Sequence, residues 1–188
     1  GVTKEHRIIG NGLTPSFENM FTSKAELLST KENRAAYTTI PYRGLPVLLK
    51  AMQGLQQDTK LDVYSSMRVY QQSDDAYAAI YQEATHDPRV TLHGSVSQKE
   101  LATRLRPVAF LTYPCICEET FCIGALEAMA AGMKVLATTL GALPTTTMGY
   151  ADLIRLRSNH AEDLVEDYRA LMDKSITEFL AHPDVWAE

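Results

Sequence analysis

The 188-residue sequence has no uninterrupted apolar run of about 18 residues, the length that a membrane-spanning helix needs. Its amino terminus does not show the charged-then-apolar layout of a signal peptide. The chain also has no run of Lys or Arg, and its formal net charge of −5 argues against gripping nucleic-acid phosphates. These absences predict a soluble, cytoplasmic protein without a nucleic-acid partner.

Cysteine is scarce, and the three cysteines do not form a standard zinc pattern. Cys115, Cys117 and Cys122 follow a C-x-C-x4-C spacing, and His93 is the one candidate for a fourth ligand. Packed, reduced thiols are the favoured interpretation, and an odd number of cysteines fits a reducing compartment. No Asn-x-Ser/Thr acceptor occurs, so nothing indicates secretion. We therefore expect neither a metal site nor a disulfide framework.

Several well-known catalytic and phosphate motifs are also missing. Gly10-Asn-Gly12 begins like a dinucleotide fingerprint, but no third glycine follows and Pro15 stands where the helix should begin. The chain contains no Gly-Lys-Ser/Thr, which excludes a P-loop, and no G-x-S-x-G elbow, which removes support for Ser-His-Asp hydrolysis. A dinucleotide enzyme is therefore an improbable interpretation.

What the chain does contain is an alternation of strand and helix patterns in an otherwise ordinary globular composition. The hydrophobic content of 45% suffices for one core. The predicted strands cover residues 34–40, 61–66, 90–94, 108–113, 134–138 and 152–155. Predicted helices lie at 22–31, from 45, at 74–85, from 97, after 121, and in a long final stretch from about 161 to 180. This order predicts an α/β fold, a Rossmann-like open parallel sheet with helices on both faces.

Parallel sheets bind ligands outside the carboxyl ends of their strands. The loops 41–44, 114–121 and 140–144 are predicted to meet at that edge. Backbone N–H groups near Thr120, Phe121 and Cys122 would there face an anion such as phosphate, and Arg43 would add a positive charge. Glu127, further along the helix, is suited to a ribose diol.

Each of these residues also has a purely structural interpretation. Glu127 can be a solvated helix residue, and Glu119 a first-turn acid that favours the helix dipole. Arg43 and Gly44 can belong only to a turn, and ending a helix is the favoured role of Gly132. Spacing alone predicts no more than a phosphorylated ligand.

Taken together, the motifs resemble the C-terminal, donor-binding domain of a GT-B glycosyltransferase of family 4, also called group 1. The resemblance runs in order over about residues 8 to 165, and its most specific part is E-x7-E followed by EAMAAG. It is carried by Asn11-Gly-Leu13, Pro41-Tyr-Arg-Gly-Leu45, His93-Gly94, Tyr113-Pro114, Glu119-x7-Glu127, Ala128-Met-Ala-Ala-Gly132 and Gly141-Ala-Leu-Pro144.

The resemblance implies a nucleotide-diphosphate sugar as donor. Glu119 would lie against the transferred sugar as the catalytic residue, and Glu127 would hold the ribose hydroxyls. The implied diphosphate contacts are Arg43, Gly44, Thr120, Phe121 and Cys122.

The chain departs from the family pattern at two positions. Family members place an Arg where this chain has Thr38, which removes one positive charge unless Arg68 or a residue outside the chain supplies it. The acid that often follows the Gly-x-x-Pro loop is replaced by Thr145.

The implied activity is a retaining, hexosyltransferase-type transfer to an unidentified acceptor: a glycan, a lipid or a small molecule. GT-B enzymes need no bound divalent ion, and the chain has no Asp-x-Asp, so no metal or other cofactor is expected. Two alternatives remain open: a sugar-nucleotide epimerase of the same fold, and a degenerate, non-catalytic nucleotide-sugar binding module. The nucleotide base, the sugar, the acceptor and the oligomeric state are not predicted by the sequence.

The resemblance also implies a domain organisation. Residues 1–16 are expected to form the interdomain passage, and residues 17–188 the donor-binding domain with its long final helix. That helix either covers the sheet of its own domain or packs on the other half. The N-terminal acceptor domain is expected to lie outside this chain, which would then bind donor without transferring it. For the longer protein, a peripheral place at a membrane remains compatible with a cytoplasmic location.

Overall fold

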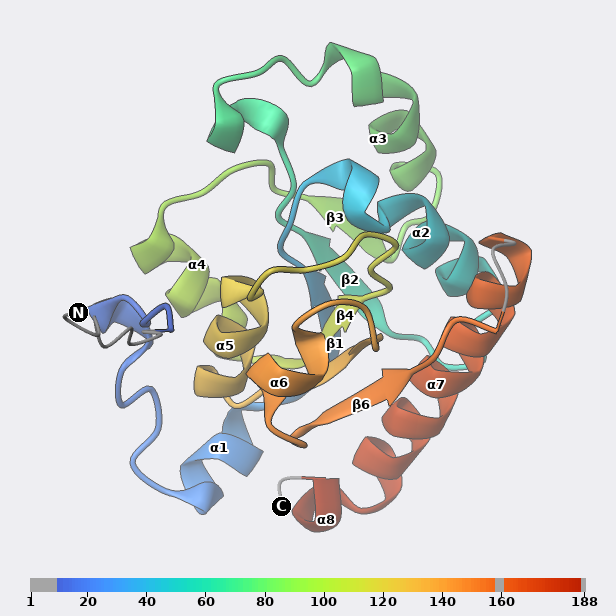
Figure 1. Ribbon diagram of the computed structural model, residues 1–188. Helices are drawn as coiled ribbons and strands as arrows, with labels where there is room; N and C mark the ends of the chain where they lie inside the picture. The colour runs from blue at the N-terminus through green and yellow to red at the C-terminus, as the bar shows by residue number, and fades with distance from the viewer. Residues whose placement is uncertain (1–9, 158–160, 187–188) are drawn as a thin grey trace, which may run out of the picture.

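The computed structural model describes residues 10–157 and 161–186, which form one sheet covered by helices (Figure 1). Six strands pair in the order β3-β2-β1-β4-β5-β6, and every pair is parallel. The strands are β1 (Glu32–Tyr37), β2 (Lys60–Val63), β3 (Val90–Leu92), β4 (Val108–Tyr113), β5 (Lys134–Thr138) and β6 (Ala151–Ile154). The predicted Rossmann-like sheet is confirmed.

The central strand β4 has helices over both of its faces (Figure 1). All six residues of β4 are buried, as expected for a strand in the middle of a parallel sheet. β4 and β5 have the predicted bounds. β1 and β2 end three residues earlier than predicted, and the last hydrogen bond between them runs from the Tyr64 N–H to the Tyr37 carbonyl at 2.8 Å. The residues that follow leave the sheet and line its edge.

The helices lie on both faces of the sheet, with α2, α3 and α7 on one side and α1, α4, α5 and α6 on the other (Figure 1). Their bounds are α1 (Lys24–Thr30), α2 (Leu45–Gln53), α3 (Ala78–Ala84), α4 (Gln98–Leu105), α5 (Ile123–Ala130), α6 (Leu143–Thr147), α7 (Ala161–Ala181) and α8 (Pro183–Trp186). Short 3-10 turns are η1 (Pro15–Phe17), η2 (Pro41–Arg43), η3 (Met67–Tyr70) and η4 (Asp75–Tyr77). None of the helices in the described ranges is long and apolar enough to cross a membrane.

Three local predictions differ from the structure or fall outside it. The predicted loop 140–144 runs into helix α6, because Pro144 sits in the first turn, where a missing N–H costs nothing. The predicted helix over 74–85 is split into η4 and α3. The chemistry of residues 6–15 predicts a strand followed by a turn, and residues 6–9 of that segment lie outside the described residues.

The long helix α7 covers the sheet of its own domain. Tyr168, Met172 and Ile176 on α7 are fully buried, and the Tyr168 hydroxyl donates to the Leu136 carbonyl of β5 at 2.6 Å. Of the two placements that the sequence left open, the structure shows this one.

Strand order changes direction between β1 and β4. From β1 the chain adds β2 and β3 on one side, then crosses through α4 and adds β4, β5 and β6 on the other. Crevices of open α/β sheets form at such a switch point, outside the carboxyl ends of the strands. The ends of β1 and β4, at Tyr37 and Tyr113, therefore mark where a ligand would bind.

At the opposite edge of the sheet, a buried lysine ties β4 to α5. The Lys31 side chain is 8% exposed, and its amino group donates to the carbonyls of Val108 at 2.7 Å and Ala131 at 2.6 Å. Burial, together with the charge of Arg106, lowers the pKa of Lys31 to about 7.

Replacing Lys31 by Met should lower the free energy of unfolding by about 2–4 kcal/mol, because two buried carbonyls lose their donor. The loss should be larger at pH 9 than at pH 7. Between the folded pKa of about 7 and the unfolded value near 10.4, the unfolded chain binds more protons, so the lysine's contribution to stability rises with pH. Urea unfolding at both pH values measures this difference.

Lys99→Met is the matched control, because Lys99 is exposed on α4. It should change the free energy of unfolding by no more than about 0.5 kcal/mol at either pH. Equal effects of the two substitutions would contradict the role assigned to Lys31.

Candidate functional site

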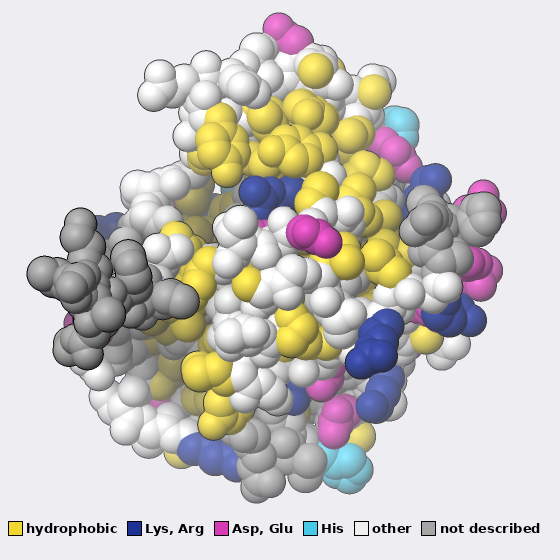
Figure 2. Space-filling view, in the orientation of Figure 1, with side chains coloured by type: hydrophobic (Ala, Val, Ile, Leu, Met, Phe, Trp, Pro, Cys, Tyr) yellow, Lys and Arg dark blue, Asp and Glu magenta, His cyan; other side chains and the backbone are white. Residues whose placement is uncertain are grey.

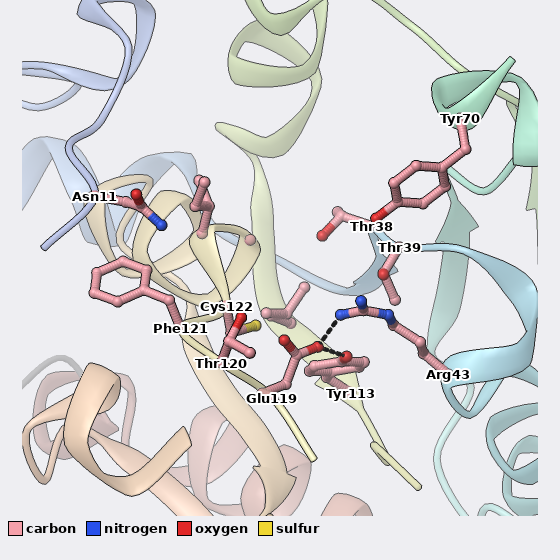
Figure 3. A pocket seen from close by; sticks show the side chains of 13 residues that line it. Asn11, Thr38, Thr39, Arg43, Tyr70, Tyr113, Glu119, Thr120, Phe121 and Cys122 are labelled. Carbon is pink, nitrogen blue, oxygen red and sulfur yellow. Dashed lines mark hydrogen bonds and ion pairs between the residues drawn. The ribbon is translucent and has the colours of Figure 1, made fainter. Parts of the chain in front are cut away.

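A pocket of about 260 Å³ opens at the switch point between β1 and β4 (Figure 3). Its walls come from segments that are far apart in the sequence and meet only in the folded chain. The lining residues are Asn11, Thr38, Thr39, Arg43, Tyr70, Leu111, Tyr113, Glu119, Thr120, Phe121, Cys122, Ile123 and Gly124. Predicted site residues Arg43, Glu119, Thr120, Phe121 and Cys122 are thus brought together, whereas Gly44 does not line the pocket.

Glu119 lies on the pocket floor, four residues before α5, so it is not a first-turn acid of that helix. Its side chain is 5% exposed. The loop after β5 presses on its backbone: the Ala142 N–H donates to the Glu119 carbonyl at 2.8 Å. Gly141 has φ +58°, and a Cβ there would lie 2.2 Å from the same oxygen. Only glycine permits this approach, which fixes the place of Glu119.

Two side chains donate to the same carboxylate oxygen of Glu119. They are the guanidinium Nη1 of Arg43 and the hydroxyl of Tyr113 (Figure 3). Gly44 makes this meeting possible, because it has φ +135° and a Cβ there would lie 2.2 Å from the Pro114 carbonyl. The turn that carries Arg43 therefore packs directly on the end of β4, and Gly44 acts through close backbone approach.

The contacts with Glu119 help to raise the pKa of both donors, Tyr113 and Arg43. Burial, with the Cys115 thiol and Glu119 adding to it, holds the pKa of Tyr113 far above its usual range, so the hydroxyl stays protonated and donates. Burial disfavours the charged form of Arg43, but its contacts with Tyr113 and Glu119 outweigh this and raise its pKa. The Nε atom of Arg43 is buried and has no hydrogen-bond partner among the described residues. The guanidinium therefore retains an unused donor.

The segment that leads into α5 presents free backbone donors to the pocket. No described residue accepts a hydrogen bond from the amide N–H groups of residues 120–124. Cys122, the residue before the helix, has φ +69°, and the Thr146 hydroxyl donates to the Phe121 carbonyl, which holds the segment from α6. A helix start with unpaired amides attracts an anion.

The other end of α5 is closed in the way that the sequence predicted. Gly132 has φ +65°, its N–H donates to the Met129 carbonyl at 2.9 Å, and the Met133 N–H donates to the Ala128 carbonyl at 2.9 Å. These are the two bonds of a Schellman motif, so the helix-ending role of Gly132 is confirmed.

Glu127 faces a second pocket of about 230 Å³ that adjoins the first. Its side chain is buried, at 5% exposed for the residue, so the alternative of a solvated helix residue is wrong. Burial raises the pKa of Glu127, and the Gln98 side chain opposes that shift. The residues Thr38, Thr39 and Tyr70 line both pockets, so the two acids sit in neighbouring parts of one continuous site.

Two residues of the site, Tyr113 and Tyr70, were not predicted from the sequence as site residues. Tyr113 was expected only as part of a motif, although a polar side chain at the end of a buried strand was a usable signal. Tyr70 carried no signal, because it reaches the pockets from the exposed turn η3. Arg68, the candidate for replacing the missing family Arg, is exposed and lines neither pocket.

The cysteines beside the site are thiols. The Cys115 sulfur lies 2.9 Å from the Cys117 carbonyl oxygen and 3.2 Å from the Tyr113 hydroxyl oxygen, so its single S–H has two acceptors within reach. Burial raises the pKa of Cys122 to about 12. Within the described ranges, no group of three or more His, Cys, Asp or Glu side chains is placed to hold a metal ion.

A parallel sheet whose switch point carries an anion-accepting helix start and two buried carboxylates has the architecture of the C-terminal half of the GT-B fold. Sequence comparison agrees: the family model described as "Glycosyl transferases group 1" matches residues 35–174. The chain belongs to this family of group 1 glycosyltransferases. No curated protein sequence matches the chain closely enough to count as a relative.

Solved structures share the fold at low identity. HepE of Anabaena, crystallised with UDP and glucose, gives a TM-score of 0.61 at 13% identity over 90% of this chain and 47% of that chain. WaaG, a glycosyltransferase involved in lipopolysaccharide biosynthesis, gives 0.60 at 16% over 96% and 53%. Sucrose-phosphate synthase of Thermosynechococcus elongatus gives 0.61 at 24% over 90% and 42%. The chain thus spans about half the length of these proteins.

A double-mutant cycle on Arg43→Met and Glu119→Gln should show that the two side chains stabilise each other. Their coupling free energy should be about 1–3 kcal/mol, because the bond is charge-assisted and its acceptor is buried. Urea unfolding of the original chain, both single variants and the double variant gives the value.

The pair Glu100 and Arg104 on α4 provides the control, since it is an exposed i, i+4 pair joined at 2.8 Å. Its coupling should be about 0.3–0.5 kcal/mol. A coupling between Arg43 and Glu119 no larger than this would show that the site pair contributes no more to the fold than an exposed pair does.

Proposed function

We propose that this chain is the donor-binding half of a retaining glycosyltransferase that uses a nucleotide-diphosphate sugar. The observation that carries the proposal is the pair of buried acids, Glu119 and Glu127, in adjoining pockets beside unpaired backbone amides. A ligand that fills both pockets needs hydroxyls at each end and an anion between them. A nucleotide-diphosphate sugar has this order of groups.

The groups of such a donor can be assigned to the site in sequence. The ribose lies in the second pocket with its 2′- and 3′-hydroxyls donating to Glu127. The diphosphate lies over the start of α5, where the amides of residues 120–124 donate to it. The sugar lies against Glu119. On this assignment the donor also offers Arg43 a second partner, since its guanidinium can bond a phosphate oxygen in place of Glu119.

The reaction that fits this placement is transfer of the sugar with retained configuration. The bond between the anomeric carbon and the phosphate oxygen breaks, and its electron pair leaves with the nucleoside diphosphate. A new bond forms from the anomeric carbon to an acceptor oxygen, whose proton is released. Arg43 and the helix-start amides stabilise the departing diphosphate electrostatically, and Glu119 positions the sugar.

The acceptor-binding surface is proposed to belong to a separate N-terminal domain, with residues 1–16 as the passage between the two halves and residues 17–188 as the donor domain. The coverage of about half of each related structure supports this. Apolar side chains also gather on the face that Figure 2 shows. Ile123, which lines the first pocket, is 42% exposed, and Tyr42 beside Arg43 and Ile116 in the loop before Glu119 are 41% and 48% exposed. Such a rim suits closure by another domain. The chain alone should therefore bind donor without transferring it.

Glu127→Ala should weaken the binding of a nucleoside diphosphate at least tenfold, because a buried carboxylate that accepts from two ribose hydroxyls is lost. Isothermal titration with UDP, GDP and ADP identifies the nucleotide that binds and measures the loss. With the 2′-deoxy form of the same nucleotide, the effect of the substitution should be smaller, because one of the two hydroxyls is already absent.

The control is Glu118→Ala, which removes an exposed acid from the same loop as Glu119 and should leave affinity within about twofold. Unchanged affinity in Glu127→Ala would overturn the ribose assignment. Failure of all three nucleotides to bind the original chain would overturn the proposed function.

A further inference from the structure

The donor site has less positive charge than a diphosphate calls for. Among the described residues that line the first pocket, Arg43 is the one cation, and Glu119 already neutralises it. Thr38 occupies the position where the family pattern has an Arg. The site therefore has to bind a doubly charged group largely through neutral donors.

Three hydroxyl groups meet at the boundary between the two pockets. Thr38, Thr39 and Tyr70 line both of them, and these side chains have no hydrogen-bond partner within the described part of the chain. Figure 3 shows the Tyr70 ring pointing toward Thr38 with its hydroxyl end leading. Free donors that converge on one cavity are available to a ligand.

The Thr38 hydroxyl lies directly over the start of α5. A Cβ built on Gly124 would lie 3.2 Å from its oxygen, so Gly124 leaves this hydroxyl open to the helix start. The same helix start carries the unpaired amides of residues 120–124. Thr38 and these amides therefore point into the same part of the pocket, where both can donate to one ligand group.

Tyr70 is held at this part of the pocket by the turn η3, which hydrogen bonds to Asp74 stabilise. The Asp74 carboxylate accepts from the Met67 N–H and from the Ser66 hydroxyl, both at 2.7 Å. Gln71, which follows Tyr70, has φ +58° and ends the turn η3. The ring is nevertheless 55% exposed, and its neighbour Val69 is 61% exposed. An exposed aromatic that a capped turn aims at a pocket is better explained by a ligand than by packing.

We propose that Tyr70, with Thr38 and Thr39, forms a neutral hydroxyl cradle that binds the donor's diphosphate in place of the cation absent at position 38. The inference rests on the proposed function, since it assigns residues to the diphosphate of that donor. Each hydroxyl donates to a phosphate oxygen, and the helix-start amides donate to the same group. Because these donors are uncharged, they add no salt dependence to binding beyond that of the Arg43 contact.

The test uses the nucleoside diphosphate that binds tightest among UDP, GDP and ADP, together with its nucleoside. Tyr70→Phe and Thr38→Val each remove one hydroxyl and keep the shape of the side chain. Each should lower affinity for the diphosphate about threefold to tenfold and leave affinity for the nucleoside unchanged. Tyr150→Phe is the control, because Tyr150 is 65% exposed and lies outside both pockets.

The outcomes separate the two proposals. If no nucleotide binds the original chain, the proposed function and this inference both fail. If a nucleotide binds but Tyr70→Phe behaves like Tyr150→Phe, the cradle alone is wrong. If Tyr70→Phe weakens the nucleoside as much as the diphosphate, Tyr70 contacts the nucleoside and the cradle is again wrong. Thermal unfolding without ligand checks that every variant is folded.

Thr38→Arg tests the same idea in the opposite direction. It restores the family's cation, so affinity for the diphosphate should rise about tenfold at low ionic strength and the gain should shrink in high salt. The original chain should show a much weaker salt dependence. Equal salt dependence in the two proteins would show that position 38 does not face the diphosphate.

Discussion

The donor edge is organised around one buried carboxylate, Glu119, which accepts from Arg43 and Tyr113 at the switch point of the sheet. Two glycines allow this arrangement, because Gly44 and Gly141 each bring a backbone segment closer than any side chain would permit. The consequence is electrostatic. The principal cation of the site is neutralised, and an anion that enters has to compete with Glu119 for Arg43.

This competition links the parts of the proposed site. When a diphosphate draws the Arg43 guanidinium toward itself, the Glu119 oxygen that Arg43 leaves keeps its hydrogen bond from Tyr113 and can accept a second one from a sugar hydroxyl. The Nε of Arg43, which has no hydrogen-bond partner in the described ranges, gives the guanidinium a further donor for that step. Diphosphate binding and sugar recognition are thereby coupled through a single ion pair.

The sequence predicted what depends on local pattern. β4 and β5 were predicted to the residue because their apolar runs are continuous, and Gly132 was predicted as a helix end because few other residues adopt its φ. The early ends of β1 and β2 depend on where ladder hydrogen bonds stop, which composition does not encode. Tyr70 was missed because it reaches the site through tertiary folding, with no periodic pattern around it. The placement of Glu119 was predicted through resemblance, whereas its partner Tyr113 required the structure.

A crystal structure of the chain with UDP tests the central claim most directly. The account predicts that Arg43 leaves Glu119 and bonds a phosphate oxygen, that the amides of residues 120–124 donate to the diphosphate, and that the ribose hydroxyls bond Glu127. An intact pair between Arg43 and Glu119, with UDP bound elsewhere on the molecule, would contradict it.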